Sequence, residues 1–285
     1  MRVLVTGAGG QVGHELVAAF GTKGHEVVAA NRSDLDIADR DAVLRAVRAV
    51  APDAVVNAAA WTAVDACEAD PDRAFAVNAL GVRHLVEGAL LAGAHLCHLS
   101  TDYVFSGDKR DPYVEWDDPN PRSVYGRSKL GGEREIGLGH GTTLVRTSWV
   151  FGKVGSNIVK TALRLAAQDD ELTFVDDQYG CPTCAADLAV AVRELVVDRQ
   201  PGIFHVTNQG PTNWYEFVRA VLVAAGLNPS RVRPIATAEL DPPRPAPRPT
   251  NSVLDNAALR LNGLPLLPDW GESVARLVGD LQCNR

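Results

Sequence analysis

Tyr125 and Lys129 are the residues whose types and spacing most directly suggest chemistry. Residues four apart on a helix project from the same face, so the phenol and the amine would enter one pocket. A phenol with a pKa of about 10 is a poor proton donor at neutral pH, but an ammonium group one turn away and a positively charged nicotinamide would lower that pKa. Thr101, at the end of an apolar run, could hydrogen-bond the same reacting oxygen. The three residues predict delivery of a proton to an oxygen as hydride arrives.

A glycine turn after the first predicted strand indicates where the hydride would come from. Gly7, Gly10 and Gly13 follow the apolar run RVLVT and open a helical pattern. Glycines at such a turn let the backbone approach a pyrophosphate, which sits at the positive end of the helix. The turn therefore predicts dinucleotide binding, with Gln11 and Val12 as further contacts.

The end of the second predicted strand, AANRS, favours one form of the dinucleotide. It lacks the acidic residue that usually binds the ribose 2′-hydroxyl of NAD, and Arg32 would offer a charge-assisted partner to a 2′-phosphate. NADPH is therefore expected, and NADH is possible if Arg32 is only a solvated surface charge. The other predicted cofactor contacts are Asp36, Ile37, Asn57, Ala58, Ala59, Ala60 and Asn78, together with Tyr125 and Lys129.

Strand and helix patterns alternate along the first 150 residues, beginning with RVLVT, HEVVAA and PDAVVNAAA as strands. Such alternation predicts right-handed crossovers and a parallel sheet. We expect an α/β fold, a Rossmann-like doubly wound parallel sheet with a smaller, discontinuous α/β substrate lobe over the carboxyl ends of the strands. The predicted dinucleotide-binding domain comprises 1–150 and about 184–208, and the predicted lobe about 151–183 and 209–285.

Bulk composition restricts the class of protein. A chain of 285 residues with 46% apolar content suits a soluble protein with a large core. The net charge of -7 gives no basic surface for nucleic acid, and no apolar run reaches the roughly 18 residues of a membrane span. MRVLVTGAGG also lacks the features of a signal peptide. We therefore expect a cytoplasmic protein without a nucleic-acid or membrane partner.

Three further motifs are expected to be structural. The five cysteines indicate reduced thiols, and CPTC at 181–184 stands alone, so it is interpreted as incidental packing. His95 and His98 lie on an apolar strand with no carboxylate nearby and are expected to be hydrogen-bonded rather than metal-bound. The proline-rich stretch 242–249 is expected to be an ordered, extended loop rather than a docking peptide.

Taken in order, the motifs resemble the dTDP-4-dehydrorhamnose reductase family, in the extended branch of the short-chain dehydrogenase/reductase superfamily. The resemblance covers nearly the whole chain. It rests on the glycine turn, NAAAWTAVD at 57–65, STDYVF at 100–105, YGRSK at 125–129, RTSWVFG at 146–152, DDQYGCPT at 176–183 and RPTNS at 248–252.

The resemblance implies a reaction and roles in it. NADPH would reduce the C4 ketone of dTDP-4-dehydro-L-rhamnose to give dTDP-L-rhamnose. Tyr125 would protonate the nascent alkoxide, Lys129 would hold the nicotinamide ribose, and Thr101 would position the substrate. The implied substrate contacts are Asp102, Tyr103, Trp149 and either Arg244 or Arg248.

The resemblance also leaves alternatives open. Family members use acidic residues to hold a divalent ion at a dimer contact; Glu15 matches one of these, but the next falls on Ala186, with Asp187 beside it. No metal ligand is therefore assigned, and Mg²⁺ dependence and the choice between monomer and homodimer stay open. A dehydratase is disfavoured, because Tyr103 follows Asp102 where an Asp-Glu pair would be needed. The remaining alternatives are a reductase or epimerase of another nucleotide-linked deoxysugar and a non-catalytic NADP-binding regulatory subunit of the methionine adenosyltransferase type.

Overall fold

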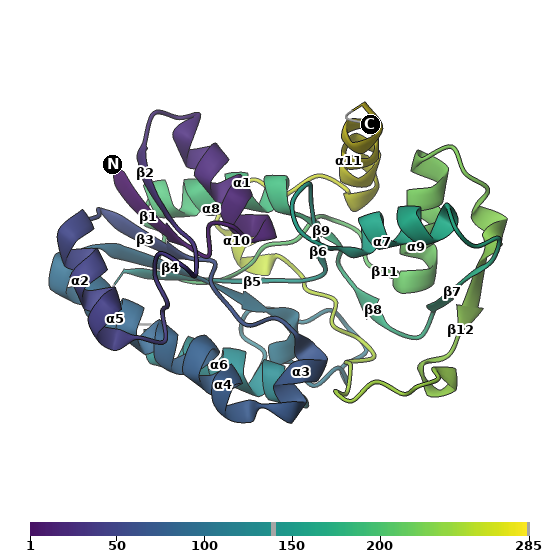
Figure 1. Ribbon diagram of the computed structural model, residues 1–285, viewed down its shortest axis with the longest axis horizontal. Coiled ribbons are helices and arrows are strands. Elements are labelled where there is room, and N and C mark those ends of the chain that lie inside the picture. Colours follow the sequence, from purple (N-terminus) through teal and green to yellow (C-terminus); the bar gives the residue numbers. More distant parts are fainter. Residues whose placement is uncertain (138–140, 284–285) are drawn as a thin grey trace.

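The computed structural model describes residues 1–137 and 141–283, and its centre is a six-stranded parallel sheet (Figure 1). The strand order β10-β5-β4-β3-β1-β2 places a switch point between β1 and β3, where open α/β sheets bind ligands. This confirms the predicted fold class, including the return of the chain to the sheet after residue 200. The six strands are β1 (Arg2–Thr6), β2 (Glu26–Ala30), β3 (Ala54–Asn57), β4 (His95–Thr101), β5 (Thr142–Thr147) and β10 (Gly202–His205).

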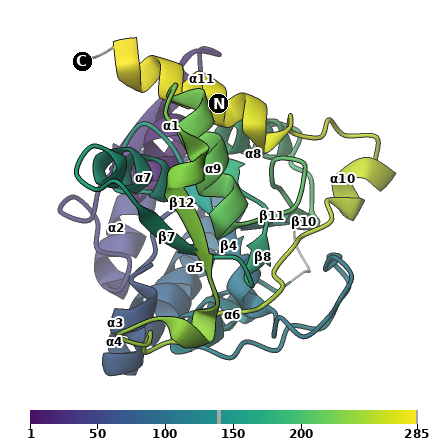
Figure 2. The same ribbon diagram turned by 90° about the vertical axis from the view of Figure 1, so that its right-hand side faces the viewer.

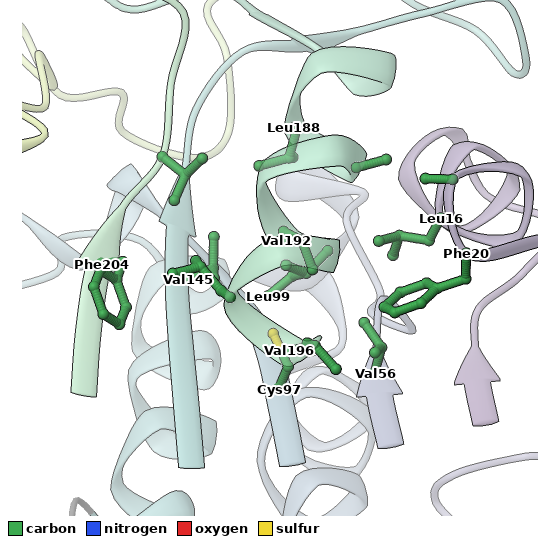
Figure 3. Packing of buried hydrophobic residues seen from close by; sticks show 14 of the residues in the cluster. Leu16, Phe20, Val56, Cys97, Leu99, Val145, Leu188, Val192, Val196 and Phe204 are labelled. Atoms are coloured by element: carbon green, nitrogen blue, oxygen red, sulfur yellow. The ribbon is translucent and has the colours of Figure 1, made fainter. Parts of the chain in front are cut away.

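Helices cover both faces of this sheet because alternate strand residues point to opposite faces and are apolar on each. One face is covered by α1 (Gln11–Gly21), α8 (Ala185–Val197) and the short α10 (Ala257–Leu261). Figure 3 shows Leu188 and Val192 of α8 beside Leu16 of α1, above the strand residues Leu99 and Val145. The other face is covered by α2 (Arg40–Val50), α5 (Gly81–Ala92) and α6 (Val124–Ile136).

The helix from 71 to 92 is long and apolar. It consists of α4 (Pro71–Phe75), the π-helical turn η1 (Ala76–Leu80) and α5, 22 residues in all. An 18-residue window within it has a mean hydropathy of 1.2, which would suffice for a membrane span by length and composition alone. A single helix of this kind is weak evidence of a membrane span, because the core helices of soluble proteins have the same length and composition. Here Val82 and Leu85 are fully buried, while Arg83 and Glu87 form ion pairs on its outer side.

A smaller lobe with its own core lies beside the carboxyl ends of the strands and faces the viewer in Figure 2. Its helices α7 (Ile158–Ala166), α9 (Trp214–Ala224) and α11 (Trp270–Cys283) enclose buried residues such as Phe151 and Phe217. Three two-stranded pairs complete it: β7 (Leu172–Val175) with β12 (Val232–Ile235), β8 (Tyr179–Gly180) with β11 (Thr212–Asn213), and β6 (Val150–Phe151) with β9 (Thr183–Cys184). The remaining short elements are α3 (Val64–Ala69), η2 (Asp102–Val104), η3 (Pro229–Arg231) and η4 (Thr237–Glu239).

The lobe boundary differs from the predicted one in one segment. Ala258, Leu259 and Leu267 belong to the core under α8, not to that of the lobe, although 209–285 was assigned to the lobe. The apolar pattern of a five-residue helix shows that it packs but not against which core, so the sequence could not place it. Residues 284–285 of the predicted range lie outside the described residues.

The motifs expected to be structural are built into the fold. All five cysteines are free, and only Cys283 is exposed. The His95 ring contacts the Thr143 hydroxyl at 2.8 Å, and His98 is hydrogen-bonded within the sheet. The proline-rich loop is anchored to α3, because the Ala246 N–H donates to Asp65.

Candidate active site

The glycine turn and the segment after β3 approach each other so closely that they form one wall of a groove. Gly7 has φ +68°, and a Cβ there would lie 2.6 Å from the Ala59 nitrogen. A Cβ on Gly13 would lie 2.1 Å from the Gly7 carbonyl oxygen, so the start of α1 also tolerates only glycine. The groove beside this wall encloses about 430 Å³ and is lined by Gly7, Gly10, Arg32, Asp36, Ile37 and Ala58–Ala60, among others.

Two arginines line this groove. Arg32 is largely exposed and lines the groove, which is compatible with the predicted phosphate contact, and its guanidinium lies 3.9 Å from the Asp36 carboxylate. Arg73 of α4 also lines the groove, with its guanidinium 4.4 Å from the centre of the Trp61 ring. Sequence reasoning missed both residues, because Arg73 belongs to no local motif and the motif NAAAWTAVD, which contains Trp61, does not indicate that this side chain faces the groove.

The two predicted cofactor-binding asparagines lie behind the groove wall. Asn57 is fully buried; its Oδ1 accepts from the Ala59 N–H at 3.0 Å, and its Nδ2 faces His98. Asn78 accepts from the Trp61 N–H at 2.8 Å and donates to Ser128 Oγ at 3.0 Å. These amides hold the segment 58–61 in place, and neither lines the groove or the adjoining cavity, so their direct contact with the cofactor stays a prediction.

The predicted reacting groups meet in an adjoining cavity of about 440 Å³. It contains Thr101, Tyr125 and Lys129, and Gly10, Ala58 and Ala60 are common to this cavity and the groove. Gln11, Val12, Gly13, Asp102, Tyr103 and Trp149 also line it, as do Thr147 and Trp214, which sequence reasoning missed.

Local structure brings Tyr125 close to Thr101. Ser123 caps α6 by accepting from the Gly126 N–H at 3.1 Å, so the helix begins just before the tyrosine. A Cβ on Gly126 would lie 2.2 Å from the Tyr103 carbonyl oxygen, which shows how tightly α6 packs on the segment after β4. The Thr101 hydroxyl is near enough to the phenol to oppose the rise of its pKa, and it donates to Asp102 Oδ1 at 3.0 Å. The threonine is thus held where it can touch an oxygen that the phenol protonates.

Burial dominates the protonation of this cavity. It lowers the pKa of Lys129 to about 8, with Glu133 opposing the shift, while Lys129 Nζ donates to the Leu99 carbonyl at 2.6 Å. It raises the pKa of Tyr125 above its ordinary value, with the Thr101 hydrogen bond opposing the shift. The lowering predicted for the tyrosine is therefore not found in the protein alone, where its phenol is fully protonated at neutral pH.

The carboxyl group of Asp102, in the same cavity, also has a shifted pKa. Its side chain is buried and accepts from the Thr101 hydroxyl through Oδ1. Burial raises the pKa of this carboxyl to about 6, and hydrogen bonds oppose the shift. Near neutral pH the group is close to its titration point, so it is poised between accepting and donating hydrogen bonds.

Two stacked indoles form the wall facing the lobe. The Trp149 and Trp214 rings lie 3.6 Å apart between centroids and 8° from parallel. Trp149 has a left-handed backbone, φ +47°, and a Cβ on Gly180 would lie 2.5 Å from its ring. The predicted Trp149 is therefore clamped flat at the cavity, as a residue that packs on a sugar or base requires.

A third cavity, of about 310 Å³, continues from the second, because Tyr103 and Trp214 line both. Arg248 lies here but is held by Asp65, with Nη1–Oδ1 at 2.5 Å and Nη2–Oδ2 at 2.7 Å. Arg244 lines the same cavity with an exposed side chain and forms no ion pair within 1–137 and 141–283. Of the two arginines weighed for a pyrophosphate, Arg244 is the one with its charge open to a ligand.

Asp187, which lies beside the position expected for a metal ligand, has its carboxylate engaged by other side chains. Asp187 accepts from Ser273, Asn208 and Arg276, so its oxygens are already occupied. The adjacent Ala186 offers no oxygen ligand from its side chain. Among the residues that the structure describes, no cluster of three or more His, Cys, Asp or Glu side chains could hold a metal.

Comparisons with known proteins agree over the whole chain. A family model described as the RmlD substrate binding domain matches residues 1–283. The dTDP-4-dehydrorhamnose reductase of Streptomyces griseus is 44% identical, over 94% of this chain and 90% of the relative. A crystal structure of a dTDP-4-dehydrorhamnose reductase from Clostridium acetobutylicum has a TM-score of 0.95 at 39% identity, covering 99% of this chain and all of the other. The Bacillus anthracis dTDP-4-dehydrorhamnose reductase in complex with NADP has a TM-score of 0.94 at 36% identity, covering 98% and 99%.

Proposed function

This chain belongs to the dTDP-4-dehydrorhamnose reductase family, and we propose that it uses NADPH to reduce the C4 ketone of dTDP-4-dehydro-L-rhamnose, giving dTDP-L-rhamnose. The observation that carries the proposal is the row of three joined cavities. The first has the glycine wall and Arg32, the second has Thr101, Tyr125 and Lys129, and the third has Arg244. The first cavity is chemically suited to a dinucleotide, the second to the ketone and the third to the diphosphate of a nucleotide sugar.

The residues of the first two cavities fit NADPH. The close approach at Gly7 and Gly13 leaves backbone, not side chain, where a pyrophosphate would lie at the start of α1. Arg32 offers a positive charge to the 2′-phosphate, and Lys129 can reach a ribose hydroxyl. We propose these contacts together with those of Asp36, Ile37, Ala58, Ala59, Ala60, Gln11 and Val12.

The chain's own residues supply the proton and the geometry of the reaction. When bound, NADPH supplies the hydride for the ketone carbon. Tyr125 holds a full proton at neutral pH, because burial raises the pKa of its phenol, and donates it to the ketone oxygen. Thr101 orients that oxygen, and Lys129 one turn away stabilises the phenolate left behind.

The substrate's remaining parts would lie toward the lobe. The flat face of Trp149 packs against the deoxysugar, and Asp102 and Tyr103 hydrogen-bond it. Arg244 pairs with the diphosphate, while Arg248, held by Asp65, shapes the cavity wall.

The wider organisation follows from these roles. We propose a dinucleotide-binding unit of 1–150 and about 184–208, joined by the α10 segment, and a substrate lobe formed by 151–183 and most of the remaining chain.

The free cysteines support a cytoplasmic location. Size-exclusion chromatography with light scattering would decide between a monomer and a homodimer.

Nicotinamide absorbance tests the proposed reaction. Purified protein receives dTDP-4-dehydro-L-rhamnose with excess NADPH or NADH in separate assays. We expect substrate-dependent oxidation that is faster with NADPH. Faster oxidation with NADH would keep the reaction and remove the role of Arg32. No oxidation by folded, cofactor-binding protein would contradict the proposal, and other 4-keto sugars and then the regulatory alternative would be tested next.

Tyr125→Phe tests the assigned proton donor. The phenyl ring keeps the packing and removes only the hydroxyl, so turnover should fall by about 10²- to 10⁴-fold while NADPH binding stays largely intact. Stopped-flow measurement of turnover and fluorescence titration with NADPH check the two parts. An active variant would exclude Tyr125 as the donor.

A further inference from the structure

A line of buried polar side chains runs behind Lys129 across three neighbouring strands. Lys129 Nζ lies 3.2 Å from His98 Nε2, and His98 Nδ1 lies 2.9 Å from Asn57 Nδ2. Asn57 Oδ1 in turn accepts from Thr6 Oγ1 at 2.7 Å. All four residues are at most 2% exposed, so solvent cannot replace any of these contacts. The donors and acceptors must therefore match within the line itself.

The two donors that contact the Asn57 amide oxygen fix the orientation of this amide. The Ala59 backbone N–H can only donate, and it points at Asn57 Oδ1 at 3.0 Å. The Thr6 hydroxyl donates to the same oxygen. The amide nitrogen therefore faces His98, and because it only donates, His98 Nδ1 must accept.

This arrangement assigns the His98 proton. An imidazole whose Nδ1 accepts carries its hydrogen on Nε2, and an imidazolium is excluded because its Nδ1–H would face the Asn57 N–H. Nε2–H then points at Lys129 Nζ. An ammonium group has three donors and no acceptor, whereas an uncharged amine has a lone pair that can accept this hydrogen.

We propose that His98 is a positioning residue for Lys129, donating from Nε2 to the amine whenever the amine is uncharged and thereby opposing its ionisation. Lys129 then holds two contacts at once, because its own N–H donates to the Leu99 carbonyl at 2.6 Å. The amine is fixed toward the cavity, and a proton can be added to it only when the His98 contact is given up.

Other titratable groups around the pair do not replace this contact. Tyr125 precedes Lys129 by one turn of α6, and Glu133 follows it by one turn, where its carboxylate is bound by Arg146 and Ser100. Burial and the nearby Lys129 hold the pKa of His98 well below its usual range, in agreement with a neutral ring. Burial lowers the pKa of Lys129 and Glu133 opposes that shift. The His98 contact that we propose would act in the same direction as burial.

The first test is nitrogen NMR of protein labelled with ¹⁵N-histidine. The chain has seven histidines, and the His98 signals are identified by their loss in His98→Gln or, if that variant does not fold, by elimination with variants at the other histidines. We expect a neutral ring with the hydrogen on Nε2 across the pH range in which the protein is folded. A hydrogen on Nδ1, or an imidazolium near neutral pH, would overturn the proposal.

Asn57→Asp tests which atoms donate and which accept along this hydrogen-bonded line, and it leaves the shape of the side chain almost unchanged. One carboxylate oxygen still accepts from Ala59, but the other now accepts from His98 Nδ1, which moves the ring hydrogen and leaves the Nε2 lone pair facing Lys129. We expect the ¹⁵N spectrum to report the other tautomer. The Lys129 midpoint in the pH profile of kcat/KM should also rise by about one pH unit or more, since the ammonium gains an acceptor and a nearby negative charge. A folded variant with an unchanged tautomer would refute the mechanism.

Two controls separate this effect from general disturbance of the sheet. Thr6→Val removes a hydroxyl but leaves the Ala59 N–H to orient Asn57, so the His98 tautomer should not change. His95→Gln alters another buried histidine of β4, which contacts Thr143 instead, and should leave the pH midpoint in place. A shift in the His95 variant as large as in Asn57→Asp would show that the pH profile does not report the His98–Lys129 contact.

The inference deepens the proposed function but can fail separately from it. If no nucleotide sugar is reduced, the tautomer of His98 still supports or refutes the contact with Lys129. If reduction is observed and the tautomer is wrong, the reductase assignment stands and His98 has no part in it.

Discussion

The cofactor side and the substrate side of the cavity row are built in different ways. The cofactor side is walled by backbone at the ends of sheet strands, where Gly7 and Ala59 approach within a distance that excludes a side chain. The substrate side is walled by side chains such as Trp149, Trp214 and Arg244, which come from distant segments and loops. We therefore expect the rigid sheet to set the position of the hydride donor, and the choice of sugar nucleotide to depend on residues that can be exchanged without altering the fold.

The largest expected effect comes from breaking the backbone wall with Gly7→Ala. The new Cβ would meet the Ala59 nitrogen at 2.6 Å, and the left-handed φ of +68° is itself unfavourable for alanine. We expect NADPH affinity to fall by at least about 100-fold, equivalent to about 2.7 kcal/mol. Calorimetric titration with NADPH measures this.

Gly24→Ala is the matched control, because Gly24 also has a positive φ, +75°, but nothing lies within 4 Å of its Cβ position. It should cost about 1 kcal/mol of unfolding free energy and leave NADPH affinity intact. Equal loss of affinity in both variants would show that backbone strain, rather than the close approach, controls binding.

Asp102, at the junction of the two sides, is expected to make stability depend on pH. Its pKa is raised from 3.8 to about 6 in the folded protein, so the folded state binds this proton more tightly and loses stability as pH rises through that window. Asp102→Asn removes this titrating group and therefore the loss of folding stability that it causes as pH rises. Its unfolding free energy relative to the native sequence should improve by up to about 3 kcal/mol between pH 4 and pH 7.5. Denaturant titrations at the two pH values check this, and a difference that is the same at both would contradict the raised pKa.

On the substrate side, Arg244→Gln should raise KM for the sugar nucleotide by about tenfold, the loss of roughly one charged hydrogen bond. KM for NADPH should stay the same, because Arg244 lies in the third cavity only. Steady-state kinetics with each reactant varied in turn separates the two. Arg219→Gln, an exposed arginine on α9 paired with Glu216, is the control and should change neither constant.

The smallest effect is expected for Arg32→Gln. The side chain is 70% exposed, so its charge is screened and its removal should reduce the preference for NADPH over NADH by only about threefold to fivefold. The effect should shrink further at high salt. An exposed arginine of α2, Arg45, provides the control. An unchanged preference in Arg32→Gln would transfer the phosphate-binding role to Arg73.

The two sides also differ in how far their residues could be predicted. Gly7, Gly13, Tyr125 and Lys129 lie in short motifs whose spacing implies a turn or a helix face, and the structure places them where those motifs predict. Trp214 belongs to no such motif, because only the folding of the lobe brings it against Trp149.

Burial was the physical quantity that sequence spacing did not supply. Asn57 and Asn78 follow the expected pattern, but both are buried behind the wall, where their amides hydrogen-bond the segment 59–61. The same holds for the Tyr125 pKa, whose direction depends on desolvation that no i, i+4 spacing reveals.

The position of α8 and β10 late in the chain has a consequence for synthesis on the ribosome. The apolar face of β3, β4 and β5 is complete once residue 147 has been made, yet the helix that covers it comes only at Ala185–Val197 (Figure 3). Until then the nascent sheet exposes Cys97, Leu99 and Val145. An emerging chain with this uncovered face is open to aggregation, so we expect the interval between the two segments to be the period in which it depends most on chaperones.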